Sequence, residues 1–500
     1  MNKAHLPWLL AGITFVFHAI GNPHYGFFRD ELYFIMCGRH PAWGYVDQPP
    51  LTPLLAAGTQ VFGHSLFLLR LIPAICATAT VYIACLFVTE LGGGTFAQIL
   101  TAICVTLAPV LASFGMKQST DMLQMPLWPL AALFALRAID RAQPKWWLSA
   151  GVALGIAFNG KYSVLFFAIA LIAGILISPM RSTLFNKWFA GGAAIAILLA
   201  LPNTLWQILH GLPMWELLQN GAHGKNVVLS PTEYVLQEVL ITNPVLSLIW
   251  VGGLVWAMIA PARRWIAYSY FVLLIIMIAT HAKHYYPASV YPMLFAAGAV
   301  AIESWTVRFT WPRIPIAIAA AAFGVLMIPL VMPVLPVPTF LAYQAALHMT
   351  PSSSEHTRLG ALPQDYADMI GWESMTQAVA GVYKALPPQD RRRTAIFASN
   401  YGEAAALDFF GAAYGLPPAS SGHNQYFLWG PRGYAAPDEV LITINVSGKD
   451  VRSSFNRVDL ATTFPNDSLA RPAEQDDPIY VSRNIKRPID QIWPSTKLYI

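Results

Sequence analysis

Long apolar segments recur through the first two thirds of this sequence, and they restrict the folds that the chain can adopt. Runs long enough to cross a bilayer occur near residues 6–21, 66–89, 95–113, 120–139, 146–160, 162–179, 188–207, 243–260, 264–280, 285–303 and 313–334. Several of these runs are short or contain proline. The pattern therefore predicts a polytopic α-helical membrane protein with about 11 transmembrane helices, within a range of roughly nine to thirteen.

Charged residues are scarce, and they are unevenly distributed along the chain. They make up 11% of the 500 residues, and the mean hydropathy is +0.48, whereas soluble proteins carry about 25% charged residues. Residues 1–344 contain 27 charged side chains, and the much shorter segment 345–500 contains 30. We therefore expect two domains, a multi-span membrane domain over 1–344 and a soluble domain over 345–500.

The C-terminal segment mixes strand-like and helix-like pieces. TAIFASN, EVLITINV and DPIYVSR have the composition of strands, whereas WESMTQAVAGVYKAL and EAAALDFFGAAYG have the pattern of helices. The segment is therefore predicted to be an α/β domain. Its stretch SGHNQYFLWGPRG combines loop residues and aromatics, which fits either an acceptor-binding rim or a plain surface loop.

The basic residues predict how the helices are oriented in the membrane. If the N-terminus is cytoplasmic, the inner loops contain ten Lys and Arg against three acids, whereas the outer loops contain seven of each, as the positive-inside rule requires. The span count then places the C-terminal domain outside the cytoplasmic (inner) membrane. The net charge of +5 does not indicate a nucleic-acid partner, because the basic residues are dispersed singly between apolar spans.

The loop 22–65, on the predicted outer face, contains a segment that does not resemble a membrane span. From residue 30 to residue 65 it carries a charge about every ten residues, and it contains the helix breaker DQPPLTP. This pattern predicts one or two short amphipathic helices on the membrane surface, the second beginning at Pro49 and Pro50. Such helices would hold Asp30 and Asp47 over the outer ends of the bundle.

Polar side chains gather at the predicted outer ends of several helices. A charge at the end of an apolar span is costly unless it is partnered or functional. A solvated rim can explain any one of these residues, but the whole set on one face favours a functional site. The candidates are Asp30, Glu31, Asp47, Lys117, Asp121, Lys161, Lys283 and Tyr285.

Several motifs resemble those of a known enzyme family. They are RDELYFIMCGRHPAWGYVDQPPLTPLLA, KQSTDML, LGIAFNGKYSVLFF, LPNTLWQILHG and HAKHYYPASVYPMLFAAGAVAIE, with NYGEAAALDFFGAAYGLPPASSGHNQYFLWGP in the C-terminal domain. The chain is similar to the bacterial relatives of dolichyl-phosphate-mannose protein mannosyltransferases, a group in the GT-C class that includes the lipid A aminoarabinose transferase. The resemblance extends over nearly the whole chain.

This resemblance implies an integral membrane enzyme whose active site lies on the outer face. Such an enzyme transfers a sugar, with inversion, from a polyprenyl-phosphate carrier to a hydroxyl group of a glycan, lipid or protein acceptor. The match to the family motifs assigns the role of base to Asp30, with Glu31 beside it. It also assigns acceptor or donor binding to Asp121.

The sequence departs from the family pattern at one position. Relatives often have a basic residue before PPL, close to the donor phosphate, but this chain has Gln48 there, preceded by Asp47. Lys283 and Lys117 are the expected substitutes. Lys161 could be a further phosphate contact or a lysine that snorkels toward the membrane surface, and Tyr285 could stack on a sugar ring or belong to the interfacial aromatic belt.

The chemistry of the candidate residues agrees with this assignment. A carboxylate can accept the proton that an attacking hydroxyl group loses, and Lys or Arg can neutralise the leaving phosphate. Because phosphate is a stable anion, no general acid is needed, in contrast to glycosidases with their paired carboxyl groups.

The scheme requires no cofactor, although His281 and His284 could bind a divalent cation together with Asp30 or Glu31. Interfacial histidines that bond to backbone are the commoner case, and the family resemblance implies no metal for monophosphate carriers. Glu238 could be a further site acid or a solvated loop acid.

Two other classes of function compete with glycosyl transfer. The first is a lipid or solute transporter or flippase with an extracytoplasmic domain, and the second is a non-catalytic scaffold or sensor. Transporters place charges near the bilayer midplane and often contain repeated halves. This sequence shows no repeat, and its acids cluster at one surface, which favours the glycosyltransferase.

Overall fold

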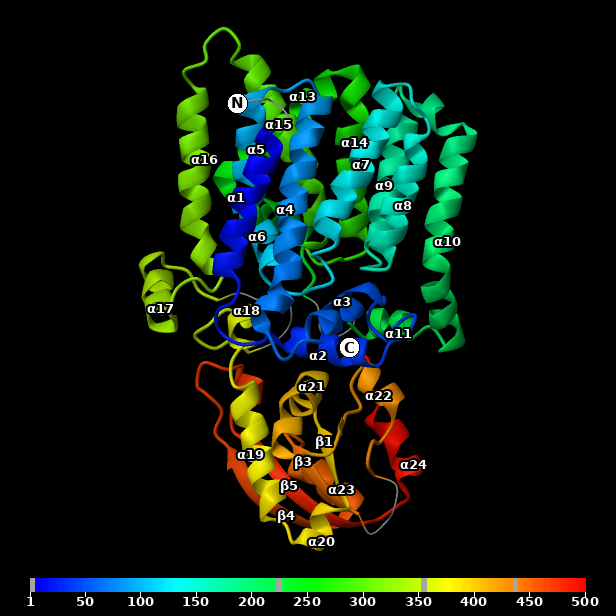
Figure 1. Cartoon of the computed structure of the whole chain (residues 1–500), viewed down its shortest axis with the longest axis vertical. Coiled ribbons are helices and arrows are strands. Elements are labelled where there is room, and N and C mark those ends of the chain that lie inside the picture. Colours follow the sequence, from blue (N-terminus) through cyan, green and yellow to red (C-terminus); the bar gives the residue numbers. More distant parts are fainter. Residues whose placement is uncertain (1–4, 222–226, 352–357, 435–438) are drawn as a thin grey trace.

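The computed structural model describes residues 5–221, 227–351, 358–434 and 439–500. It contains an α-helical bundle and, beneath one end of it, a smaller domain built around a β-sheet (Figure 1). Short helices lie between the two, and the C-terminus returns to this junction. Lys3 and Lys225, which entered the count of basic residues, lie outside the described residues.

The helices of the bundle coincide with the predicted apolar runs. Their bounds are α1 Leu6–Gly21, α4 Leu66–Glu90, α5 Thr95–Leu107, α6 Pro109–Met116, α7 Gln124–Asp140, α8 Trp146–Phe158, α9 Val164–Ile177, α10 Lys187–Leu209, α13 Pro244–Ile259, α14 Arg264–Ala279, α15 Tyr291–Trp305 and α16 Arg313–Met327. Among the described residues, four helices are long and apolar enough to cross a membrane, or up to six if each of two bent pairs forms one span. The chain is thus a multi-pass membrane protein.

Two pairs of helices meet at sharp bends, and the first bend divides an apolar run that was predicted as one span. The run 95–113 is divided into α5 and α6, which meet at 64°, and α12 (Pro231–Ile241) meets α13 at 109°. At the first break Ala108 is extended before Pro109, as steric contact with a following proline favours. This break directs the end of α6, and with it Lys117, toward the C-terminal domain.

Small residues allow the bundle helices to approach closely. A Cβ atom on Gly298 of α15 would overlap the backbone of Ile249 on α13, and one on Gly192 of α10 would overlap the backbone of Trp147 on α8. Only glycine therefore fits at these two crossings, which is a common feature of helix contacts in membranes.

The loop after α1 forms two short helices across the end of the bundle, as predicted. These are α2 (Arg29–Arg39) and α3 (Leu51–Thr59), and Pro50 is the residue that caps the second. Figure 1 shows α2, α3 and α11 (Pro213–Asn220) between the bundle and the C-terminal domain. Leu32 and Ile35 of α2 belong to the same buried cluster as Leu407 and Ile442 of the C-terminal domain. Helix α2 thus packs as part of that domain.

The C-terminal domain contains a five-stranded mixed sheet in the order β2-β1-β3-β5-β4. Its strands are β1 Thr394–Ala398, β2 Ala419–Ser420, β3 Val440–Ile444, β4 Phe455–Phe464 and β5 Asp477–Ile485. β1 runs parallel to β2 and β3, whereas β5 is antiparallel to β3 and β4. The strand patterns noted in the sequence correspond to β1, β3 and β5. β4 was not predicted, because it is a mostly exposed edge strand.

The C-terminal domain also contains several short helices. They are α18 Gln364–Ala367, α19 Trp372–Ala385, α20 Pro388–Arg391, α21 Tyr401–Phe410, α22 Gln425–Trp429, α23 Gly448–Ser454 and α24 Ile489–Ile492. α17 (Val337–Ala346) precedes them and begins before residue 345. α19 and α21 were expected from the sequence. Figure 1 shows α21 at the end of the domain nearest α2, and it packs against α2.

Candidate active site

A cavity of about 730 Å³ lies where the bundle, the short helices α2 and α11 and the C-terminal domain meet. Seven of the eight candidate residues line it, although they come from five separate parts of the sequence. These are Asp30, Asp47, Lys117, Asp121, Lys161, Lys283 and Tyr285. Acids and lysines thus surround one space at the end of an apolar bundle.

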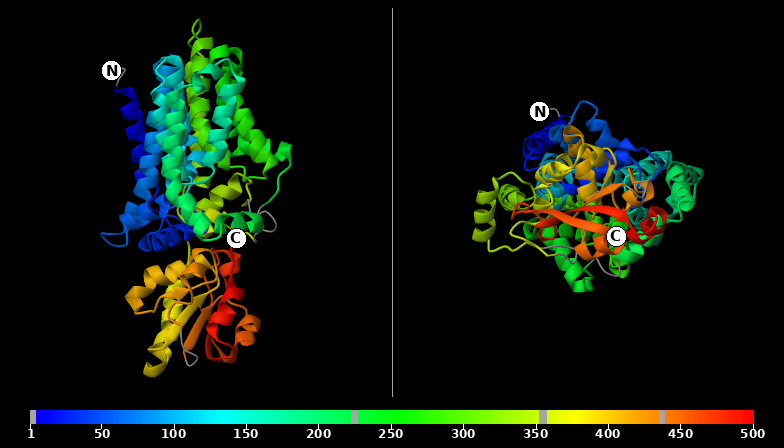
Figure 2. Two further views of the ribbon diagram at one scale, coloured as in Figure 1. Left: turned by 90° about the vertical axis from the view of Figure 1, so that its right-hand side faces the viewer. Right: turned by 90° about the horizontal axis from the view of Figure 1, so that it is seen from below.

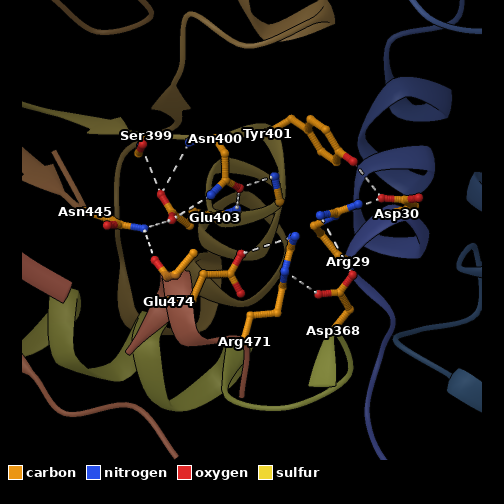
Figure 3. Close-up of polar contacts among 12 residues, drawn as sticks. Arg29, Asp30, Asp368, Ser399, Asn400, Tyr401, Glu403, Asn445, Arg471 and Glu474 are labelled. Carbon is orange, nitrogen blue, oxygen red and sulfur yellow. Dashed lines mark hydrogen bonds and ion pairs between the residues drawn. The ribbon is translucent and has the colours of Figure 1, made fainter. Parts of the chain in front are cut away.

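Asp30 is held by two donors on the same carboxylate oxygen. Its Oδ1 accepts hydrogen bonds from the hydroxyl group of Tyr401 at 2.8 Å and from Nε of Arg29 at 3.0 Å. The Asp30 side chain is 31% exposed, and it lines the cavity. Figure 3 shows Tyr401 of the C-terminal domain reaching across to Asp30 at the start of α2. The carboxylate is therefore both oriented and accessible, as a general base must be.

Glu31 was a second catalytic candidate, with the alternative that it orients Asp30 or meets an arginine, and the structure shows it paired with an arginine. Adjacent side chains on a helix point about 100° apart, and Glu31 is turned into the protein, where it is fully buried. Its carboxylate accepts bonds from Nε and Nη2 of Arg70, from the backbone N–H of Phe28 and from that of Gln118, all at 2.8–3.0 Å. Glu31 thus lies outside the cavity and fixes the start of α2.

Arg70 was not identified from the sequence as a site residue, yet it organises the loop before α2. It donates to the backbone carbonyl oxygens of Asn22, His24 and Gly26 at 2.8–2.9 Å, in addition to Glu31. The sequence did contain an indication that Arg70 has a partner, because it is a lone arginine within the apolar run of α4, where an uncompensated charge is costly.

Asp47 lies between α2 and α3, and it joins the loop 22–65 to the C-terminal domain. Its carboxylate accepts hydrogen bonds from the Tyr33 hydroxyl at 2.8 Å and from Nδ2 of Asn424 at 3.3 Å. Burial raises the pKa of Asp47 to about 6. The backbone N–H of Gln425 also donates to the Tyr33 hydroxyl, and Asn424 lines the cavity, so this part of the stretch HNQYFLW packs against the loop 22–65.

Asp121 and Lys161 form an ion pair within the cavity. The Lys161 Nζ lies 2.7 Å from both carboxylate oxygens of Asp121, and it is 4.1 Å from the centre of the Tyr286 ring. Lys161 therefore points into the cavity and does not snorkel along the lipid surface.

Two further lysines line the cavity. Lys117 forms an ion pair with Asp365 of α18 and lies 4.4 Å from the centre of the Phe28 ring. Lys283 lies in the loop after α14, with its Nζ 6.0 Å from the centre of the Tyr285 ring.

The remaining polar candidates have other surroundings. Glu238 is fully buried in α12, so it is neither a solvated loop acid nor part of the cavity wall. His284 lines the cavity, and burial lowers its pKa to about 4. Across the described ranges, no group of three or more His, Cys, Asp or Glu residues could hold a metal ion.

Several residues of the cavity wall were not predicted as site residues. Tyr401, Asn424 and Asp365 all come from the part of the chain after residue 344, more than 300 residues from Asp30. The only signal for the first two was their presence in the motifs NYGEAAAL and HNQYFLW, which contributed to the family resemblance.

Comparison with known proteins agrees with this architecture. Residues 47–206 match the family model described as dolichyl-phosphate-mannose-protein mannosyltransferase. The lipid A galacturonosyltransferase RgtD of Rhizobium johnstonii is 26% identical over 308 residues, a match that spans 57% of this chain and 62% of that protein. The chain thus spans about three fifths of the length of this curated relative.

Two solved structures show the same fold over the whole chain. Both are of ArnT from Cupriavidus metallidurans, one in the apo state and one bound to undecaprenyl phosphate. The TM-scores are 0.62 and 0.60, at 12% and 13% identity, and each match covers 96% of this chain and 97% of the other. Together with the family match, these findings confirm the resemblance to bacterial GT-C glycosyltransferases.

Proposed function

We propose that the chain is an inverting glycosyltransferase that moves a sugar from a polyprenyl-phosphate carrier to a hydroxyl group of an acceptor. The observation that carries this proposal is the composition of one cavity, where Asp30 faces the same space as Lys117, Lys161 and Lys283. Transfer from a lipid phosphate needs a base for the acceptor and cations for the leaving group. Both are present at the end of an apolar bundle that can receive a prenyl chain.

In this reaction Asp30 acts as the base. Its carboxylate accepts the proton of the acceptor hydroxyl while the hydroxyl oxygen attacks the anomeric carbon from the face opposite the phosphate. The bond from the anomeric carbon to the phosphate oxygen breaks, so the configuration inverts and the carrier leaves as polyprenyl phosphate. No proton has to be donated to this leaving group, because phosphate is a stable anion.

The lysines of the cavity bind the phosphate of the donor. A hydrogen bond between an ammonium group and phosphate is stronger than one between neutral groups, and the partly enclosed cavity strengthens it further. We assign this contact to Lys283 and Lys117. Asp121, paired with Lys161 at 2.7 Å, holds that lysine in place and can accept hydrogen bonds from sugar hydroxyl groups.

The names of the relatives support the choice of substrates. One is a lipid A galacturonosyltransferase, and the other was crystallised with undecaprenyl phosphate. We therefore place the donor among polyprenyl-phosphate sugars. The acceptor belongs to the glycans, lipids or proteins of the cell envelope.

The location of the reaction follows from the distribution of charge. We propose that residues 1–344 form the membrane domain in the cytoplasmic membrane and that residues 345–500 form an extracytoplasmic domain. The basic inner loops support this orientation. The C-terminal domain lies at one end of the bundle (Figure 2), and residues of both parts line the cavity, so in this orientation the cavity faces outward.

The decisive experiment uses the purified full chain. Lipids that copurify with it are identified by mass spectrometry, and the matching polyprenyl-phosphate sugars are then supplied with envelope lipid and glycan acceptors. We expect transfer of the sugar and release of polyprenyl phosphate. Absence of transfer from every such donor, together with movement of lipid across proteoliposomes, would support a flippase and overturn the proposal.

A further inference from the structure

The start of helix α21 is fixed by its own capping interactions. The Asn400 side chain accepts hydrogen bonds from the backbone N–H groups of Gly402 and Glu403 at 2.9 and 3.0 Å. Glu403 accepts a bond from Nδ2 of Asn445 at 2.7 Å and one from the backbone of Ser399 at 2.9 Å. Tyr401 is the first residue of this helix, so its side chain extends from a firmly held part of the C-terminal domain (Figure 3).

The ring of Tyr401 is held between residues of α2. Its centre lies 4.6 Å from that of Tyr33 and 5.2 Å from the guanidinium carbon of Arg29. Only 8% of the residue is exposed, yet it contributes to the cavity wall. Burial raises the pKa of Tyr401 well above its ordinary range, so its hydroxyl remains a donor over the working pH range.

The second donor to Asp30 is also held by the C-terminal domain. Nη1 of Arg29 lies 3.8 Å from the carboxylate of Asp368, and the backbone N–H of Arg29 donates to the Asp368 carbonyl at 3.0 Å. Asp368 is itself paired with Arg471 at 3.1 Å. Both donors to Oδ1 of Asp30 are therefore positioned by residues beyond 344 (Figure 3).

We propose that Tyr401 is a positioning residue for glycosyl transfer, through which the C-terminal domain orients the carboxylate of Asp30 and keeps it in its basic, ionised form. This inference rests on the proposed function. A hydrogen bond donated to a carboxylate favours the charged form, and the donors on Oδ1 fix the direction in which the carboxylate faces the cavity. The C-terminal domain is thus a component of the active site.

The test compares wild type, Tyr401→Phe and Tyr414→Phe in the full chain. Tyr414 lies in the same domain, outside the cavity wall, and its hydroxyl accepts a bond from Gln377. Loss of a hydrogen bond to a charged group should lower kcat of Tyr401→Phe roughly 10- to 100-fold. KM for the donor should stay within about twofold, and Tyr414→Phe should behave as wild type.

The pH profile separates positioning from a general loss of structure. The titratable and charged groups that face Asp30 include Arg29, Tyr401, Asp47 and Asp368. Without the Tyr401 hydroxyl, the acidic limb of kcat/KM should move to higher pH. An unshifted limb with an unchanged kcat overturns the proposal.

A double-mutant cycle with Asp30→Asn completes the test. If Tyr401 acts through Asp30, Tyr401→Phe should change the residual rate of Asp30→Asn by less than about twofold, whereas additive losses would show an independent role and overturn the proposal. Activity of the wild type in the same assay separates the two hypotheses. An inactive wild type contradicts the proposed function itself, whereas an active wild type with an equally active Tyr401→Phe contradicts only the positioning role.

Discussion

Arg70 and Glu31 form an ion pair in which both side chains are fully buried, with Nε and Nη2 of the arginine each 3.0 Å from a different carboxylate oxygen. Because of this pair, the neighbouring acids Asp30 and Glu31 have different roles. Glu31 anchors the start of α2 to α4, and as a consequence Asp30 is turned toward the cavity.

Replacement of Asp30 by asparagine should remove the proposed general base while preserving the shape of the side chain. Transfer should fall roughly 10²–10⁴-fold, whereas donor binding and expression should remain near wild type. The measurement is the transfer rate at saturating donor, with binding of the polyprenyl-phosphate sugar measured separately. A folded Asp30→Asn protein that transfers at the wild-type rate would exclude Asp30 as the base.

Replacement of Glu31 by glutamine should act on stability. It leaves the Arg70 charge buried without its partner, which should cost about 3–5 kcal/mol. Asp459→Asn is the matched control, since Asp459 pairs with Arg457 on the surface at 3.0 Å and such pairs contribute at most about 1 kcal/mol. Thermal unfolding in detergent should show a much lower Tm for Glu31→Gln only. Equal Tm values for the two variants would contradict the structural role of the buried pair.

Lys283→Ala should weaken use of the donor. Loss of a charge-assisted contact to phosphate costs on the order of 1.5–3 kcal/mol, which corresponds to roughly a 10- to 150-fold rise in Kd for the donor. Lys449→Ala, on the exposed surface of α23, is the control. Titration with polyprenyl phosphate measures the effect, and identical Kd values for wild type and Lys283→Ala would remove Lys283 from the donor site.

The buried acid Asp477 predicts a pH dependence of stability. Burial, and secondarily Asp476, raise the pKa of Asp477 to about 7 in the folded state, whereas the ordinary value is about 3.9. Between these values the folded chain binds more protons than the unfolded chain. The contribution of this group to stability therefore falls as pH rises from about 4 to 7, and it stays low above that range.

Asp477→Asn should reduce this dependence. Tm of the wild type should fall between pH 5 and pH 8, and the fall should be smaller for the variant because the amide does not titrate. Asp450→Asn, on the surface, should keep the wild-type slope. A variant with the full wild-type slope would show that Asp477 does not contribute to it.

Topology can be measured with reporter fusions. A reporter after residue 500 should be extracytoplasmic, whereas one within residues 261–264, between α13 and α14, should be cytoplasmic. The physical basis is the excess of Lys and Arg in the predicted inner loops. Two reporters on the same side would contradict the span count and separate the C-terminal domain from the outer face.

Much of the architecture was predictable because the relevant forces act over short stretches of sequence. Apolar runs fold as helices wherever they enter a bilayer, so the bundle helices lie where the runs predicted them. Strand-like composition likewise located β1, β3 and β5. The polar edge strand β4 was not predicted, because it forms a strand through pairing with β5 and its own sequence pattern does not indicate one.

The membership of the site was also largely determined by sequence. A residue at the outer end of a span must lie at one surface, and that rule gathered Asp30, Asp121, Lys161 and Lys283 into one region. Their partners were decided by tertiary structure. Helix α4 lies close to α2, so Arg70 pairs with Glu31. The break at Ala108 directs Lys117 toward Asp365, with which it forms an ion pair. Docking of the C-terminal domain brought Tyr401 to within 2.8 Å of Asp30, 371 residues earlier in the chain. Spacing along a chain specifies which face a side chain occupies, but contacts between distant segments depend on how those faces pack.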